Sequence, residues 1–218
     1  MTTVVIDYGR GNLFSLGHAL RTLGRPFLVS GDPGTLAQAE RVILPGVGAF
    51  PDAMAELDRR DLVGPLQEFA RSGRPILGIC LGMQLLTTVS EEFGRTTGLG
   101  LIPGLVRRLP RRTSDETGSR VPNVGWRTLR FHRESRLVPA TDAQVYFAHS
   151  FMVETDESEH TVASIEVNRA RAAAIIQSRN VIGFQFHPEK SGVAGLGLLD
   201  AFVSAPHHLP EDVEESLP

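Results

Sequence analysis

Short apolar runs alternate with longer amphipathic stretches in the first part of the chain. Short apolar runs are typical of buried strands, whereas apolar positions three and four residues apart are typical of helices. The amphipathic stretches at residues 12–23 and 62–72 each end at a glycine, and residues 30–34 have the composition of a turn. The alternation predicts a mostly parallel sheet with helices on both faces. Its first strands are expected at residues 4–7, 26–29, 41–44 and 75–79.

From Gly104 onward the apolar runs are shorter and no longer alternate with helical stretches. We therefore expect an α/β fold with an open, mostly parallel or mixed sheet in three layers and a small antiparallel extension. Without an internal repeat or a linker, residues 1–205 should form one domain, followed by a disordered acidic tail at 206–218. The later strands are expected near residues 105–109, 121–126, 144–147, 161–165, 172–177 and 181–186.

The composition describes a chain that can bury a single core. It has 218 residues, of which 41% are hydrophobic, and a formal net charge of −3. We expect a cytoplasmic protein without membrane association, because the chain has no apolar run that would span a bilayer and no signal peptide. The single cysteine rules out an internal disulfide, and no metal or cofactor is expected. The arginine-rich residues 107–136 would suit nucleic acid, but the mildly acidic chain favours a solvated face or contacts to a protein partner.

That single cysteine, Cys80, stands between a predicted strand and a predicted helix. Such a turn holds its residue in a strained backbone and exposes the side chain at the carboxyl edge of the sheet. Gly78 and Gly82 relieve the crowding there, and the N-terminus of the following helix favours a thiolate. A buried core cysteine is the simpler interpretation, but the pattern favours a nucleophile.

A second strand, at residues 181–186, ends in His187-Pro188-Glu189. A cysteine nucleophile needs a base within hydrogen-bond reach and a third group that orients the base. His187 and Glu189 supply both at one strand end, on the edge of the sheet where open α/β folds place their sites. The alternative is a turn with a surface His and Glu. This alternative is less favoured, because Cys80 is expected at the same edge of the sheet.

A glycine loop, Pro45-Gly46-Val47-Gly48, follows the predicted strand at 41–44. Backbone N–H groups of Val47 and Gly48, with that of Leu81 after the cysteine, could form an oxyanion hole for a tetrahedral intermediate. The loop lacks the spacing and the Lys-Ser/Thr pair of a nucleotide-binding loop.

Taken together, six segments resemble the class I glutamine amidotransferases, and more narrowly the glutaminase subunits of imidazole glycerol phosphate synthases. The resemblance covers about residue 3 to residue 204. The cysteine turn and His-Pro-Glu indicate only a class I glutamine amidotransferase. The other segments are what narrow the resemblance to the glutaminase subunits. The segments are Asp-Tyr-Gly-Arg-Gly-Asn at 7–12, Leu-Pro-Gly-Val-Gly-Ala-Phe at 44–50, Gly-Ile-Cys-Leu-Gly-Met-Gln at 78–84, Pro-Asn-Val-Gly-Trp at 122–126, Tyr-Phe-Ala-His-Ser-Phe at 146–151 and Phe-Gln-Phe-His-Pro-Glu-Lys-Ser at 184–191.

The resemblance implies that Cys80 attacks the side-chain amide of glutamine while His187, held by Glu189, passes the proton to ammonia. Ammonia then enters a cyclase subunit with a (β/α)₈ barrel, which completes a heterodimer and makes imidazole glycerol phosphate and an aminoimidazole carboxamide ribonucleotide in histidine biosynthesis. Substrate contacts are implied for Gly46, Gln84, Glu92, Ser150 and Phe151, and places at the partner interface or ammonia channel for Asn12, Asn123, Trp126, Tyr146 and Lys190.

The chain departs from the family pattern at several positions outside the expected triad. Asn123 stands where His is usual, Arg127 where Asn is usual, and Phe151 where Tyr is usual. A stand-alone glutaminase or γ-glutamyl hydrolase of the same fold stays open, although the Gly-Gly-Glu-Ser loop typical of pyridoxal-synthase glutaminases is absent. A non-catalytic partner-binding member would be expected to have lost Cys80, His187 or Glu189, all of which are present.

Overall fold

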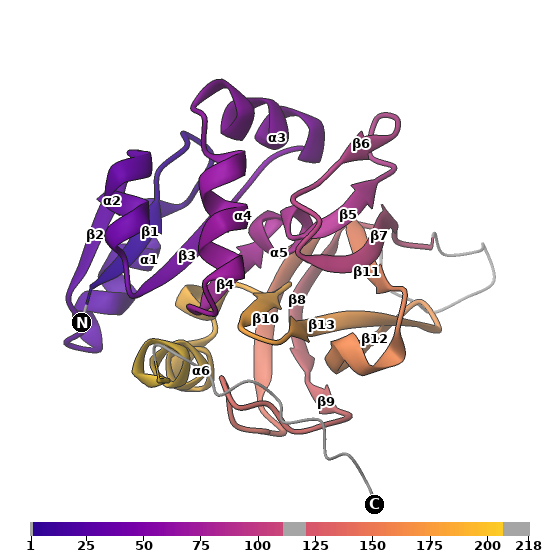
Figure 1. Cartoon of the computed structure of the whole chain (residues 1–218). Helices are drawn as coiled ribbons and strands as arrows, with labels where there is room; N and C mark the ends of the chain where they lie inside the picture. The colour runs from indigo at the N-terminus through magenta and orange to yellow at the C-terminus, as the bar shows by residue number, and fades with distance from the viewer. Residues whose placement is uncertain (1, 111–120, 207–218) are drawn as a thin grey trace, which may run out of the picture.

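A computed structural model describes residues 2–110 and 121–206 of the chain (Figure 1). Strands and helices alternate through its first half, as the apolar pattern predicts. The elements are β1 (Thr3–Ile6), α1 (Leu13–Thr22), β2 (Phe27–Ser30), α2 (Pro33–Gln38), β3 (Arg41–Gly46), α3 (Phe50–Arg59), α4 (Val63–Arg71), β4 (Ile76–Cys80) and α5 (Leu81–Leu85).

The second half is mainly β-structure and ends in one helix. Its elements are β5 (Thr87–Ser90), β6 (Thr96–Thr97), β7 (Ile102–Arg108), β8 (Asn123–Thr128), β9 (Arg130–Phe131), β10 (Gln144–His149), β11 (Phe151–Thr155), the 3₁₀ helix η1 (Ser158–His160), β12 (Thr161–Val167), β13 (Ala170–Ser178), β14 (Val181–Phe184), the 3₁₀ helix η2 (Pro188–Lys190) and α6 (Gly192–Ser204).

One large mixed sheet organises the molecule, with the strand order β2-β1-β3-β4-β14-β13-β12-β9 (Figure 1). The strands from β2 to β14 run parallel to their neighbours, and the strands beyond β14 run antiparallel. Two smaller sheets, β11-β7-β5-β6 and β10-β8, form the extension. The predicted α/β fold with a small antiparallel extension is thus confirmed.

Apolar side chains pack against both faces of the large sheet. One core cluster includes residues of α1 and α6, and the other includes residues of α2, α3 and α4. Helices therefore cover both faces, which is the three-layer arrangement expected from the alternation of strands and helices. None of the helices in the described part of the chain is both long and apolar enough to cross a lipid bilayer.

Three α-helices were not predicted from the sequence, namely α2, α3 and α6, the last of which lies in the part of the chain where only strands were expected. Residues 30–34 were expected to form a turn, but α2 begins at Pro33, where Asp32 accepts a hydrogen bond from the Thr35 N–H at 2.7 Å and caps the helix. Pro33 also suits the first turn of a helix, since its ring fixes a helical φ. Similarly, α3 occupies a stretch after the glycine loop for which no element was predicted.

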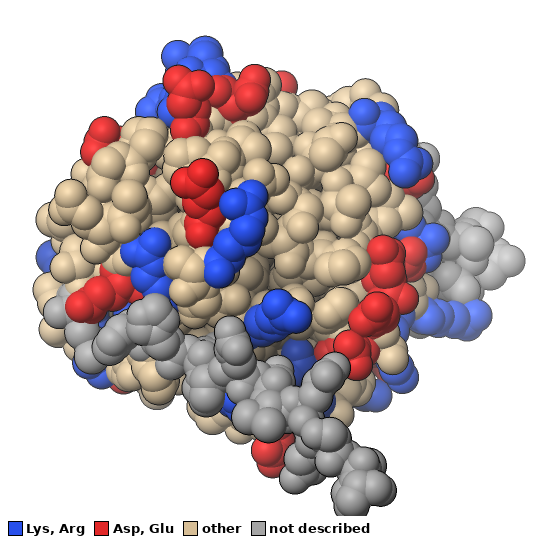
Figure 2. Space-filling model, in the orientation of Figure 1, with Lys and Arg blue, Asp and Glu red and all other residues tan. Residues whose placement is uncertain are grey.

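Charged side chains of both signs are interspersed over the face shown in Figure 2. Within the arginine-rich segment, Arg107 contacts Glu154, and Arg130 lies 3.1 Å from Glu166. These pairs agree with a solvated face. Arg111, Arg112, Arg120 and the tail after Pro206 lie outside the described residues.

Candidate active site

Cys80 is the last residue of β4 and directly precedes α5. Its backbone has φ 56° and ψ −110°, a conformation that residues with a side chain rarely adopt. Two glycines make the turn possible. A Cβ on Gly82 would lie 1.9 Å from the carbonyl oxygen of Leu44, and a Cβ on Gly78 would lie 2.6 Å from the carbonyl oxygen of Gly82. The strained turn predicted for Cys80 is therefore present, at the carboxyl edge of the sheet.

His187 reaches the same edge from the neighbouring strand. β14 runs parallel to β4, with Phe184 opposite Ile79, so the chain beyond β14 continues beside the turn at Cys80. The His187 backbone N–H donates to the Tyr146 carbonyl at 3.0 Å. These backbone contacts fix the imidazole next to the cysteine, although more than a hundred residues separate the two in the sequence.

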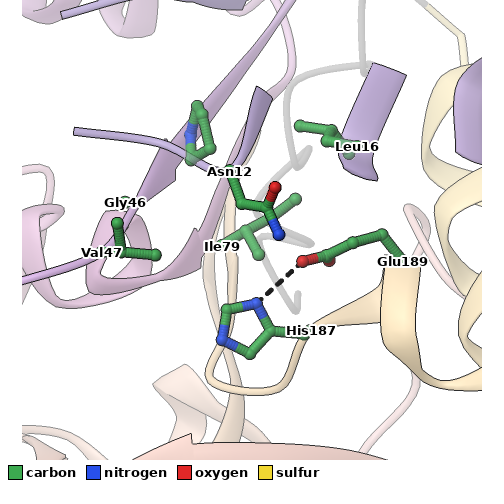
Figure 3. A pocket seen from close by; sticks show the side chains of 8 residues that line it. Asn12, Leu16, Gly46, Val47, Ile79, His187 and Glu189 are labelled. Carbon is green, nitrogen blue, oxygen red and sulfur yellow. Dashed lines mark hydrogen bonds and ion pairs between the residues drawn. The ribbon is translucent and has the colours of Figure 1, made fainter. Parts of the chain in front are cut away.

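Glu189 holds the far side of the imidazole ring. Its Oε1 lies 2.9 Å from Nδ1 of His187 (Figure 3). Burial favours the neutral ring, but hydrogen bonds to Cys80 and Glu189, and the negative charges of both, outweigh burial and raise the pKa of His187 to about 10. The ring is therefore protonated at neutral pH. With Nδ1 turned toward Glu189, Nε2 is the nitrogen left to exchange a proton with the sulfur.

A hydrogen-bonded pair of glutamines reaches the cysteine through Gln185, which was not predicted. Gln185 is fully buried, and its Nε2 lies 3.9 Å from the Cys80 sulfur, within hydrogen-bond range for sulfur. Its Oε1 accepts from Nε2 of Gln84 at 3.1 Å. A polar amide inside the apolar run at 181–186 is the sequence signal that could have identified Gln185.

A cleft of about 720 Å³ opens above the cysteine. Four of the five residues expected to contact substrate line it, namely Gln84, Glu92, Ser150 and Phe151. The fifth, Gly46, faces a separate small cavity instead (Figure 3). The cleft also contains Val47, Gly48, Leu81, His187, Lys190 and several residues that were not predicted, among them Glu91, Phe93, Arg108 and His149.

Charged residues of both signs line this cleft. Glu91 and Glu92 supply negative charge, while Arg108 and Lys190 supply positive charge in addition to His187. Arg108 lies opposite Phe151 in the pairing of β7 with β11. The sequence did not distinguish Arg108 from the neighbouring arginines, because only the strand pairing brings Arg108 to the cleft.

Glu92 already has a structural partner. Its Oε2 accepts the backbone N–H of Phe50 at 2.8 Å, which caps the N-terminus of α3. Burial raises the pKa of Glu92 despite this hydrogen bond. The carboxyl group thus joins the start of α3 to the wall of the cleft.

The predicted oxyanion loop does not direct its Val47 N–H at the cysteine in this structure. That N–H donates to the Arg10 carbonyl at 2.8 Å. Gly48 has a φ of 104°, which glycine adopts without strain. Leu81 begins α5, so its N–H has no acceptor within the helix and is directed out of its first turn. A hole made of Val47 and Leu81 therefore requires the Val47 peptide to turn.

The residues expected at a partner interface occupy different environments. Trp126 is 49% exposed and makes an edge contact with Tyr146, with ring centroids 6.0 Å apart. Lys190 is exposed on η2, and Asn12 caps α1 by accepting from the Ser15 N–H at 3.3 Å. Asn123 is fully buried, and its Nδ2 lies 2.9 Å from Nε2 of His149. Its side chain is therefore buried in this structure, and its place at the interface or channel stays a prediction.

One group of possible metal ligands was not anticipated. Ligand atoms of Glu157, Glu159 and His160 lie within 4.8 Å of one another at the edge of η1. They stand on the surface rather than in the cleft described above. The proposed reaction therefore does not draw on them.

Comparison with known proteins identifies the family. The family described as "Glutamine amidotransferase class-I" matches residues 4–203. The "Imidazole glycerol phosphate synthase subunit HisH" of Geobacillus thermodenitrificans is 48% identical over 200 residues, covering 91% of this chain and 93% of the relative. The HisH subunit of Moorella thermoacetica is 45% identical over 207 residues, covering 94% of this chain and 95% of the relative.

Solved structures agree at the level of the fold. A structure titled "Crystal structure of glutamine amidotransferase" aligns with a TM-score of 0.69 at 14% identity, covering 92% of this chain and 98% of that one. A structure titled "Structure of PurLQS from Thermotoga maritima" aligns with a TM-score of 0.68 at 21% identity, covering 93% of this chain and 97% of that one. From the family match and the close relatives together, the chain belongs to the class I glutamine amidotransferase family, among the HisH subunits of imidazole glycerol phosphate synthase.

Proposed function

We propose that this protein hydrolyses glutamine to glutamate and ammonia, and delivers the ammonia to a cyclase subunit that makes imidazole glycerol phosphate. The observation that carries the chemistry is the position of Cys80 on a strained turn beside His187, whose Nδ1 is held by Glu189 at 2.9 Å. The observation that carries the biosynthetic role is the similarity to HisH subunits over nine-tenths of the chain. We assign Cys80 as nucleophile, His187 as acid and base, and Glu189 as the group that orients His187.

The reaction follows from this arrangement. The Cys80 sulfur attacks the side-chain carbonyl carbon of glutamine, a C–S bond forms, and the carbonyl oxygen takes the negative charge. As the C–N bond breaks, His187 Nε2 gives its proton to the leaving nitrogen, and ammonia departs from a glutamyl thioester. His187, now neutral, removes a proton from water. The hydroxide that forms adds to the thioester, and loss of the Cys80 thiolate yields glutamate.

The cleft is suited to a free amino acid. Glutamine carries an α-ammonium and an α-carboxylate, and the cleft offers carboxylates as well as cations. We assign Glu92 to the α-ammonium side, with Gln84 packed below. We assign the backbone at Ser150 and Phe151, together with the Arg108 guanidinium, to the α-carboxylate, since Arg binds carboxylates through two parallel hydrogen bonds.

A partner is needed to use the ammonia, because free ammonia at neutral pH is mostly protonated and no longer nucleophilic. Large apolar side chains are exposed around η2, the 3₁₀ helix that follows His187. The elements that pack against η2 include α1, α6 and β10. Phe14 on α1 is 79% exposed, and Val193 on α6 is 89% exposed. Trp126, which contacts Tyr146 of β10, is 49% exposed. Such exposed apolar groups are typical of docking surfaces. We propose that a cyclase subunit with a (β/α)₈ barrel docks here in the cytoplasm, near Asn12, Tyr146 and Lys190.

Glutamate release from glutamine tests this proposal. It is measured for the protein alone, for the protein with a cyclase subunit, and for that complex with the cyclase's nucleotide ligand. A low rate alone and a large rise in the liganded complex are expected, because the Val47 peptide must turn before the oxyanion hole is complete. A full rate alone that neither partner nor nucleotide changes would instead indicate a stand-alone glutaminase or γ-glutamyl hydrolase.

The assignment of the nucleophile is tested by Cys80→Ser in the same complex. Glutamine-dependent synthesis should be lost, while synthesis from added ammonia should persist at the wild-type rate. Loss of both activities would show that the substitution disrupts the complex, and the nucleophile assignment would then lack support.

A further inference from the structure

Tyr8 carries a hydroxyl group that the reaction described above does not use. The side chain is fully buried, and its hydroxyl oxygen has no hydrogen-bond partner among the described residues. Burial raises the pKa of Tyr8, and so does the charge of Cys80, while Arg10 acts in the opposite direction. The phenol therefore keeps its proton at neutral pH and can donate a hydrogen bond.

The hydroxyl faces the glycine loop beside the cysteine. A Cβ on Gly46 would lie 2.7 Å from the Tyr8 oxygen and 2.8 Å from the Gly82 backbone nitrogen. The side of Gly46 on which a Cβ would stand therefore faces both the Tyr8 hydroxyl and the start of α5. Only glycine leaves room here, and the hydroxyl meets the backbone of the loop directly.

The geometry of the next peptide shows what the hydroxyl can bind. The Val47 N–H points at the Arg10 carbonyl. In a planar trans peptide the N–H and the preceding carbonyl point in opposite directions. Turning the Val47 N–H away from Arg10 therefore turns the Gly46 carbonyl away from its present direction, and Gly46 is the residue that the Tyr8 hydroxyl lies against.

We propose that Tyr8 is a positioning residue for the oxyanion loop, whose hydroxyl donates to the Gly46 carbonyl once the Gly46–Val47 peptide has turned. In the conformation seen here, the Val47 N–H is satisfied by Arg10 and the Tyr8 hydroxyl is not satisfied. In the turned conformation the N–H serves the oxyanion and the hydroxyl gains an acceptor. Tyr8 thereby offsets part of the free energy that is needed to break the bond to Arg10.

A purely structural role explains the ring of Tyr8 but not its oxygen. Phenylalanine would fill the same space without a buried, unpaired hydroxyl, which destabilises the folded state. Unfavourable groups of this kind concentrate at functional sites, where a second state satisfies them. The two roles predict opposite effects of removing the oxygen on stability, and the experiment uses this difference.

The test is Tyr8→Phe in the full chain, assayed with the cyclase subunit and its nucleotide ligand. This inference rests on the proposed glutaminase function, which the wild-type complex tests in the same experiment. We expect kcat for glutamine hydrolysis to fall about tenfold, which corresponds to the loss of one hydrogen bond. KM for glutamine should stay within about twofold, because the hydroxyl does not contact the substrate, and the Tm of the variant alone should rise.

Ammonia-dependent synthesis by the variant complex serves as the control for folding and assembly, and it should match wild type. The inference is overturned if kcat remains at the wild-type value. It is equally overturned if Tm and kcat fall together, since the oxygen would then stabilise the resting fold. A wild-type complex that does not hydrolyse glutamine would instead remove the proposed function itself.

Discussion

Glu189 accepts a hydrogen bond from Nδ1 of His187 with one carboxylate oxygen, at 2.9 Å, while its other oxygen is buried and has no hydrogen-bond partner within the described part of the chain. The carboxylate therefore makes a single directed contact, which fixes both the tautomer and the orientation of the ring. This contact leaves Nε2 directed at the Cys80 side, where the proposed reaction needs it.

Replacing Glu189 with Gln should preserve the size of the side chain but remove the charge that holds the protonated ring. We expect kcat for glutamine hydrolysis in the complex to fall about a hundredfold or more, as for other triads that lose their orienting carboxylate. Synthesis from added ammonia should remain at the wild-type rate. A glutamine-dependent rate within about threefold of wild type would contradict the assigned role.

The raised pKa of His187 predicts how stability depends on pH. A group whose pKa is raised on folding stabilises the protein fully below its unfolded pKa, and the effect is lost as pH rises through the folded pKa. His187 shifts from 6.5 to about 10, so its contribution should decline across this interval. Urea unfolding of wild type should show this decline, and the Cys80→Ala variant should show less of it. An equal decline in both would mean that Cys80 does not raise the pKa.

Arg108 should determine recognition of the α-carboxylate. Arg108→Ala is expected to raise KM for glutamine about tenfold or more with a small change in kcat, because a charge-assisted hydrogen bond to the substrate is lost. Arg107→Ala is the matched control, since Arg107 is the neighbouring residue on β7 and contacts Glu154 instead. Glutamine α-amide, which lacks the carboxylate, should be a poor substrate for wild type. If Arg108→Ala still discriminates against this amide as strongly as wild type does, the assignment is wrong.

Gly82 should tolerate no side chain. A Cβ there would meet the Leu44 carbonyl at 1.9 Å, so Gly82→Ala must displace β3 from α5 and should cost at least about 1–3 kcal/mol of unfolding free energy. Gly197 in α6 provides the matched control, because a Cβ there meets no described atom within 4 Å. Gly197→Ala should stabilise by about 0.5–1 kcal/mol through higher helix propensity. Urea denaturation of both variants measures the difference.

Trp126 should contribute to docking of the cyclase subunit. It is half-exposed and rests on Tyr146, and buried aromatic anchors account for much of the affinity of protein interfaces. Trp126→Ala should raise the Kd of the complex at least about tenfold, as measured by calorimetry. Leu28→Ala, on the edge strand β2 of the large sheet, removes another half-exposed apolar side chain and should leave Kd unchanged. Equal effects of the two substitutions would place the interface elsewhere.

The sequence by itself determined the parts of this protein that depend on neighbouring residues. The apolar runs and the glycines after helices identified most strands, α1 and α4, because side-chain periodicity is a local property. Cys80 and the pair His187 and Glu189 stood at strand ends, so the expectation of one shared sheet edge needed only parallel pairing. Local sequence signals did not reveal α2 and α3, because a turn-like segment precedes α2 and a glycine loop precedes α3.

Only the tertiary structure decided the contacts between distant segments. The bond from Glu92 to Phe50, the approach of Gln185 to Cys80 and the position of Arg108 opposite Phe151 all depend on how strands and loops pack. The bond from Val47 to Arg10 belongs to the same group, and it sets the resting state of the oxyanion loop. Residue types limit which chemistry is possible, but the direction of each polar group is set by partners far along the chain.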